Sequence, residues 1–205
     1  MPQPITELLP GVLHWRAIHP NTGVESSSYL ITEAGVAIDP IAPEEGLDAL
    51  PGPITAILLS NRHHLRQARE LAAHHGGVPI RASRPGLHEF APEDGVEPFD
   101  FGDTLPGNVL AREIGVICRD ETALILQDQR AVVVADGVTN YGGLQFVPDD
   151  LLGDDPVGVK TGLLDAYRAL AQEVTFDHLL PAHGTPITKN GRQALLDFVS
   201  LTNPG

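Results

Sequence analysis

The sequence predicts an α/β fold in which two mixed β-sheets pack face to face and helices cover their outer faces, a four-layer αββα sandwich. Apolar segments of strand length follow one another directly near the start and in the middle of the chain, with Gly and Pro turns between them. Helical patterns occur mainly before residue 76 and again after residue 157. A doubly wound parallel sheet fits less well, because too many strands succeed one another without an intervening helix.

In the first half of the chain, alternating or continuous apolar runs predict strands, and periodic stretches predict helices. The expected elements are strands at 11–19, 28–32, 35–39, 53–60 and 78–83, and helices at 43–50 and 63–75. The longer helix has Leu65, Ala68 and Leu71 on one face and ends at Gly76 and Gly77, as helices commonly do. This half is therefore rich in strands and ends in a βαβ unit.

The second half of the chain has strands first and helices afterwards. Pro106 and Gly107 indicate the turn of a hairpin within 98–114. The elements expected after it are strands at 122–128, 130–137 and 177–182, and helices at 158–174 and 191–202. A chain of 205 residues, 42% of them hydrophobic, is long enough for one sizeable core, so we expect a single domain over 1–205.

The composition argues against several classes of function. A formal net charge of −14 opposes binding to nucleic acids and to anionic membranes. No apolar run reaches the length of about 18 to 20 residues that crosses a bilayer, and the first residues lack the basic start of a secretion signal. We therefore expect a soluble, cytoplasmic protein with neither a nucleic-acid nor a membrane partner. Cys118, the single cysteine, cannot form an internal disulfide and is expected to be a buried small hydrophobe.

Three segments carry polar side chains just beyond the apolar end of an expected strand. They are 61–64 (NRHH) after ILLS, Asp136 after VVVA, and His183 after LLPA. Sheet-based folds assemble their sites at such strand ends. The candidate residues of the cleft are Asn61, His63, His64, Arg66, Asp136 and His183.

At these segments the chain resembles the metallo-β-lactamase superfamily. The resemblance covers nearly the whole chain and rests on short segments in the family's order. They are PGVLHW (10–15), SSYLI (27–31), GVAIDP (35–40), ILLSNRHHLRQA (57–68), ETALIL (121–126), VVVADGV (132–138) and LLPAHGTPI (179–187). The resemblance implies the αββα fold and a site for two metal ions, usually zinc, in a hydrolase.

This chain departs from the ligand pattern that the family implies. The family motif HxHxDH falls on 61–66, where only His63 matches, and the later Gly-His falls near Val116 or Ile117, which cannot bind a metal. Asp136 and His183 match the two remaining positions. The resemblance therefore implies a degraded dinuclear site, in which His63, Asp136 and His183 are the candidate metal ligands.

The replacement residues have other uses. Asn61 is a poor zinc ligand and a good helix N-cap, so we favour capping. His64 is adjacent to the matching position and is expected to face the other way, which makes it the weaker ligand candidate. A guanidinium at Arg66, about 5 Å from a divalent ion, would cost roughly 6 to 7 kcal/mol at an effective dielectric constant near 20. We therefore expect Arg66 to replace the lost positive charge by pairing with Asp136. Cys118 stays open as either a buried thiol or, after a register shift, a metal ligand.

Two functions remain open from the sequence. In the first, the chain keeps the fold without two-metal hydrolase activity and binds a small molecule or a partner, itself included. In the second, it is a hydrolase of esters, thioesters or similar small substrates that uses a single divalent ion, most simply zinc, on His63, Asp136 and His183. The segments 84–97 and 138–158, which are rich in Gly, Pro and Asp, are expected to form the rim of the cleft.

Overall fold

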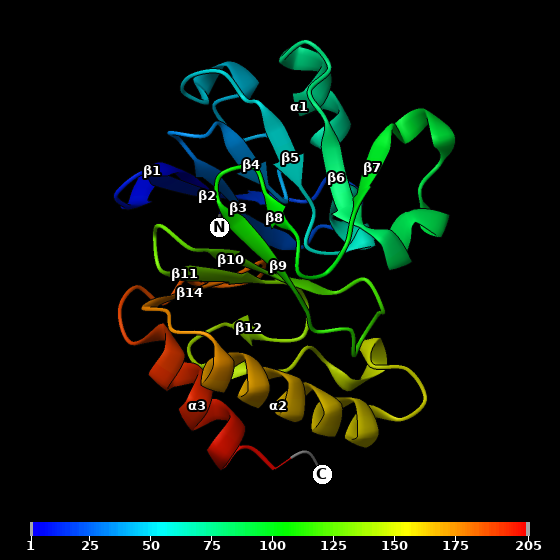
Figure 1. Cartoon of the computed structure of the whole chain (residues 1–205), viewed down its shortest axis with the longest axis vertical. Helices are drawn as coiled ribbons and strands as arrows, with labels where there is room; N and C mark the ends of the chain where they lie inside the picture. The colour runs from blue at the N-terminus through cyan, green and yellow to red at the C-terminus, as the bar shows by residue number, and fades with distance from the viewer. Residues whose placement is uncertain (1, 204–205) are drawn as a thin grey trace.

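The computed structural model describes residues 2–203 and confirms the four-layer sandwich. Two β-sheets lie face to face in the middle of the molecule (Figure 1). Helix α1 (Ala68–His74) lies on the outer face of the first sheet, and α2 (Pro156–Glu173) and α3 (Gly191–Leu201) cover the outer face of the second. No helix among the described residues is long and apolar enough to cross a membrane.

The first sheet contains seven strands in sequence order. They are β1 (Gln3–Leu9), β2 (Val12–Ile18), β3 (Glu25–Ile31), β4 (Val36–Ile38), β5 (Ala56–Leu58), β6 (Ile80–Ser83) and β7 (Val96–Phe99). The first four strands pair antiparallel, and β4 to β7 pair parallel. The parallel half lies next to α1, which supplies the crossover between β5 and β6.

The second sheet has five strands in the order β14-β11-β10-β9-β8. They are β8 (Thr104–Leu105), β9 (Val109–Glu113), β10 (Thr122–Leu126), β11 (Ala131–Val134) and β14 (His178–Pro181). Only β11 and β14 pair parallel, so their carboxyl ends meet at one edge of the sandwich. A separate hairpin of β12 (Thr139–Asn140) and β13 (Leu144–Gln145) follows that edge.

Alternation along the strands divides the core into three layers. Successive strand residues point to opposite faces, so Leu58 packs between the two sheets while its neighbour Ile57 packs against α1. In the second sheet, Val133 faces the first sheet and Val132 faces α2 and α3. The inner strands are therefore buried on both faces, which explains why β5 and β11 appear in the sequence as continuous apolar runs.

Several elements differ from the sequence prediction. The helix expected at 43–50 is only the 3₁₀ turn Leu47–Ala49, because Gly46 precedes it with φ 88°. The helix expected at 63–75 is divided into the 3₁₀ helix η2 (Arg62–Leu65) and α1, because Arg66 has φ 42° and cannot continue a right-handed helix. Strand β1 was not predicted.

Candidate metal centre

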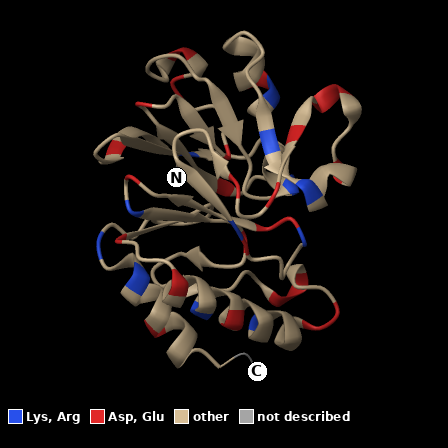
Figure 2. Cartoon of the chain, viewed as in Figure 1, with Lys and Arg blue, Asp and Glu red and all other residues tan. Residues whose placement is uncertain are grey.

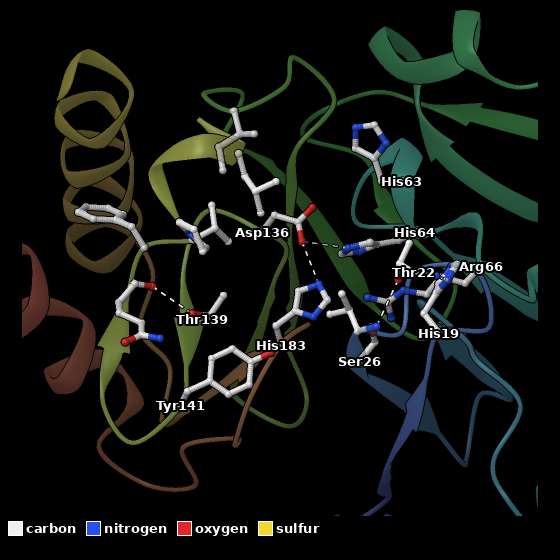
Figure 3. A pocket seen from close by; sticks show the side chains of 17 residues that line it. His19, Thr22, Ser26, His63, His64, Arg66, Asp136, Thr139, Tyr141 and His183 are labelled. Carbon is white, nitrogen blue, oxygen red and sulfur yellow. Dashed lines mark hydrogen bonds and ion pairs between the residues drawn. The ribbon is translucent and has the colours of Figure 1, made fainter. Parts of the chain in front are cut away.

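Three strand ends bring two histidines and one aspartate together. Asp136 follows β11, His183 follows β14, and His64 lies in η2 shortly after β5. One ligand atom from each of the three residues lies within 4.8 Å of the others. Asp136 Oδ1 is 3.2 Å from His64 Nε2 and 3.1 Å from His183 Nε2, and Figure 3 shows both rings turned toward this carboxylate.

His64, and not His63, is the histidine of this cluster, which corrects the sequence prediction. The side chain of Asn61 accepts a hydrogen bond from His63 N at 2.9 Å, so the chain turns into η2 at once instead of staying extended. In a 3₁₀ helix residues three apart share a face. Asn61 and His64 therefore both point at Asp136, while His63 is exposed on the rim of the cleft.

Asn61 has the capping role predicted for it and a second role in the site. Its amide Nδ2 donates to Asp136 Oδ2 at 2.7 Å. Both oxygens of Asp136 are thereby used, Oδ2 by Asn61 and Oδ1 by the two histidines. This contact fixes the rotation of the carboxylate with Oδ1 facing the rings.

The other ring nitrogen of each histidine also faces an acceptor. His64 Nδ1 is 3.0 Å from Asp39 Oδ2, and His183 Nδ1 is 3.1 Å from the carbonyl oxygen of Glu25. Asp39 is 1% exposed and accepts from Ser60 twice, through the backbone N–H at 2.8 Å and the hydroxyl at 2.6 Å. Asp39 was missed as a site residue, although its place after β4 in GVAIDP is the same strand-end signal that singled out Asp136.

Opposite charges dominate the electrostatics of the cluster. Burial would lower the pKa of His64, but the carboxylates of Asp136 and Asp39 raise it to about 9. Burial would raise the pKa of Asp136, yet contact with His64 and His183 holds it well below its usual range. The site therefore stabilises positive charge between its carboxylates.

Arg66 does not make the expected ion pair with Asp136. Its Nη1 donates to the carbonyl oxygens of Ser27 at 2.9 Å and Asp39 at 2.8 Å. The positive φ of Arg66 turns its side chain toward β3 and β4, and Figure 3 shows Arg66 beyond His64 as seen from Asp136. The guanidinium is therefore held by backbone carbonyls at the side of the cleft and does not contact the carboxylate of the cluster.

A second buried carboxylate, Glu121, supports the turn after Asp136. Its Oε1 accepts from Gly137 N at 2.8 Å and lies 3.5 Å from the hydroxyl of Tyr167. Burial and the nearby Asp136 raise the pKa of Glu121 to about 7. Sequence reasoning missed this role, because Glu121 opens an apolar strand (ETALIL) with no motif of its own. Cys118 is buried outside the cluster, and burial raises the pKa of its thiol.

The three residues of the cluster line a cleft of about 690 Å³. The segment 138–158 forms part of the cleft lining as predicted, through residues such as Tyr141, Phe146 and Leu151. No residue of 84–97 lines it, because that segment forms two 3₁₀ helices and β7 next to β6. His19 and Ser26, which the sequence did not indicate as site residues, also face the cleft.

Comparison with solved structures identifies the fold. The chain superposes on the metallo-β-lactamase FIM-1 from Pseudomonas aeruginosa in its mono-zinc form with a TM-score of 0.69 and 18% identity, over 98% of this chain and 96% of that one. The chain has the metallo-β-lactamase fold. The metallo-β-lactamase from Pontibacter korlensis gives a TM-score of 0.69 and 15% identity, over 98% of this chain and 100% of that chain.

The metallo-β-lactamase fold also occurs in longer similar proteins. Rubredoxin oxygen:oxidoreductase from Desulfovibrio gigas matches with a TM-score of 0.70 and 14% identity, over 96% of this chain and 61% of that chain. This chain thus spans about three fifths of that oxidoreductase. No family model and no curated protein matches the sequence.

Proposed function

We propose that the chain binds one divalent metal ion, most simply zinc, through His64, Asp136 and His183, and that it hydrolyses small esters or thioesters. The observation that carries the proposal is the arrangement of the two imidazoles: both Nε2 atoms face the same carboxylate oxygen, while both Nδ1 atoms face other acceptors.

Hydrogen-bond accounting supports a cation between these three residues. A neutral imidazole carries one N–H. In His183 the carbonyl oxygen of Glu25 accepts that hydrogen from Nδ1, and in His64 the Nδ1 atom faces Asp39 at 3.0 Å and the hydroxyl of Ser60 at 2.8 Å, so the neutral form that donates to Asp39 also carries its hydrogen on Nδ1. Each Nε2 lone pair then faces the lone pairs of Asp136 Oδ1, which is repulsive unless a proton or a metal ion lies between them. One divalent ion replaces two extra protons. Metal-bound histidines commonly donate their second N–H to a carboxylate or carbonyl in this way.

The carboxylate oxygen lies at the spacing of zinc ligands from both histidine nitrogens, and the ligand atoms all lie within 4.8 Å of one another. Zinc bonds of about 2.0 Å in tetrahedral geometry place ligand atoms about 3.3 Å apart, and here Oδ1 lies 3.2 Å and 3.1 Å from the two nitrogens. Two histidines and one carboxylate leave a fourth position for water or substrate. The described residues contain one such cluster, and FIM-1, a protein of the same fold, has a mono-zinc form.

The chain's own residues hold the reacting groups. Asn61 and Asp39 fix the orientations of Asp136 and His64, and the apolar side chains of the cleft exclude water around the substrate. When bound, a divalent ion supplies the positive charge that polarises a carbonyl and lowers the pKa of a water molecule. In the overall reaction one water is consumed, the acyl–oxygen or acyl–sulfur bond breaks, and an acid and an alcohol or thiol leave.

One observation favours metal-free ligand binding as a second candidate. His64 lies between the carboxylates of Asp39 and Asp136, at 3.0 Å and 3.2 Å, with the guanidinium of Arg66 nearby. A charged His64 and Arg66 together balance these two carboxylates without an ion. In that state the cleft binds a small molecule and carries out no metal-dependent chemistry.

Removal and return of the metal separate the two candidates. Hydrolysis of 4-nitrophenyl butyrate and of S-phenyl thiobutyrate, which are both uncharged, is measured with protein purified without chelator, after treatment with EDTA, and after addition of zinc. The proposal predicts activity that EDTA abolishes and zinc restores. Activity that survives EDTA, or no activity with zinc, iron, manganese or cobalt on either ester class, would contradict the hydrolase.

A further inference from the structure

The cleft above the metal centre has two chemically different ends. One wall is formed by the segment that runs from β12 to the 3₁₀ helix Asp149–Leu151 and contributes Tyr141, Phe146, Val147 and Leu151. Tyr141 and Leu151 are 53% and 63% exposed, a large exposure for side chains of this kind. Figure 3 shows Tyr141 on one side of the Asp136–His183 pair and Arg66 on the opposite side. A ligand that spans the centre therefore contacts apolar side chains at one end and a cation at the other.

Arg66 has unused hydrogen-bonding capacity at its end of the cleft. Nη1 donates to two backbone carbonyls, whereas Nη2 is buried and makes no hydrogen bond among the described residues. A buried donor without a partner is costly and rare, and such groups often mark a missing water or ion. Arg66 also lines the cleft. An oxygen of an anionic ligand is the partner that a guanidinium binds best.

The ionisable groups of the cleft favour negative ligands over positive ones. The chain as a whole has 27 acidic and 13 basic residues, excluding histidine, and acidic side chains are spread over both halves of the molecule in the view of Figure 2. Among the residues that line the cleft, Asp136 is the one carboxylate, and it is already bonded to His64, His183 and Asn61. A cationic ligand therefore finds no free carboxylate in the cleft, while an anionic ligand finds Arg66.

We propose that the cleft binds carboxylates that carry an apolar aryl or alkyl group, with the carboxylate at Arg66 and the apolar group against Phe146 and Leu151. If the proposed hydrolase function holds, the substrates are esters or thioesters that carry a free carboxylate in addition to the ester group. This statement about substrates rests on the proposed function. The binding preference itself does not depend on that function, since Arg66 and the apolar wall lie outside the metal ligands.

Three probes with one skeleton test the preference in EDTA-treated protein, where no metal contributes to carboxylate binding. They are 4-phenylbutyrate, 4-phenylbutanol and 4-phenylbutylamine, measured by isothermal titration calorimetry. A hydrogen-bonded charge pair predicts that the butyrate binds about ten-fold or more tightly than the alcohol, and the amine binds weakest. Equal affinities for the butyrate and the alcohol would overturn the proposal.

Variants assign each end of the ligand. Arg66→Met is expected to remove the preference for the butyrate over the alcohol, and Leu151→Gln to weaken the binding of all three probes. Leu201→Gln is the matched control, because Leu201 is 85% exposed on α3 and outside the cleft. If Arg66→Met does not fold, the order of the probes on the unsubstituted chain decides. If the probes bind as expected but no metal-dependent hydrolysis occurs, the proposed hydrolase function is wrong and the proposed ligand class is kept. If hydrolysis occurs without the preference for the carboxylate, the ligand class is wrong and the hydrolase function is kept.

Discussion

His14 is a buried, uncharged histidine that supports the loop of His183, one of the proposed metal ligands. A change of pH tests this role. Its side chain is 4% exposed, and its Nε2 lies 3.1 Å from Ser27 Oγ, which donates to the carbonyl oxygen of Gly184 at 3.3 Å. Gly184 directly follows His183. Burial, with a smaller contribution from Arg16, lowers the pKa of His14 from 6.5 to about 4.

The direction of the pH effect follows from these two pKa values. The unfolded chain takes up a proton on His14 as the pH falls through 6.5, whereas the folded chain does so only near pH 4. Folded stability from this residue is therefore complete above pH 6.5 and is lost as the pH falls toward 4. Linkage gives a loss of about 2 kcal/mol in the free energy of unfolding between pH 7.5 and pH 5.

The assay compares urea unfolding of EDTA-treated protein at the two pH values for the unsubstituted chain and for His14→Gln, which cannot titrate. The unsubstituted chain should lose about 2 kcal/mol more than the variant between pH 7.5 and pH 5. Taking the change with pH removes the constant effect of the substitution and the contribution of other titrating groups. Parallel pH profiles would refute the argument that His14 is buried in its neutral form.

Two further substitutions and one chemical modification test the surroundings of single side chains. Asn61→Ala should destabilise the chain by about 1 to 2 kcal/mol in urea unfolding, because it removes the cap of η2 and the donor to Asp136; an unchanged unfolding midpoint would contradict this. Gly137→Ala should cost about 2 kcal/mol and lower the melting temperature, since its Cβ would clash with the hydroxyl of Tyr167 and with Oε1 of Glu121. Burial raises the pKa of the Cys118 thiol, so a thiol-specific disulfide reagent at pH 7 should react with it slowly in the folded chain and rapidly in urea, and rapid reaction of the folded chain would show an accessible thiol.

The strands with strong apolar patterns were predictable, and the weak ones were not. The prediction of strands at 122–128 and 130–137 matches β10 and β11, because both faces of these strands are buried and the sequence is apolar throughout. Strand β1 is mostly exposed at the edge of its sheet, so it lacks the alternation that marks a strand. The two-residue strands β12 and β13 are too short to give a pattern.

In the site, the residues at strand ends were predictable, but the position at which the chain turns into η2 was not. Asp136 and His183 each lie two positions after the last residue of a buried strand, so their place depends mainly on the fold. The choice between His63 and His64 depends on where the extended chain becomes η2. Asn61 indicates this position, because a capping residue starts the 3₁₀ helix there. The residue three positions later, His64, then lies on the same face as Asn61.

The direct test of the metal centre is the metal content of protein purified without chelator, measured by mass spectrometry, for the unsubstituted chain and two neighbouring variants. The proposed function predicts one divalent ion per chain, its loss in His64→Ala, and its retention in His63→Ala, which removes an exposed histidine just outside the cluster. Two ions per chain, no ion at all, or loss of the ion in His63→Ala with retention in His64→Ala would contradict the proposed centre.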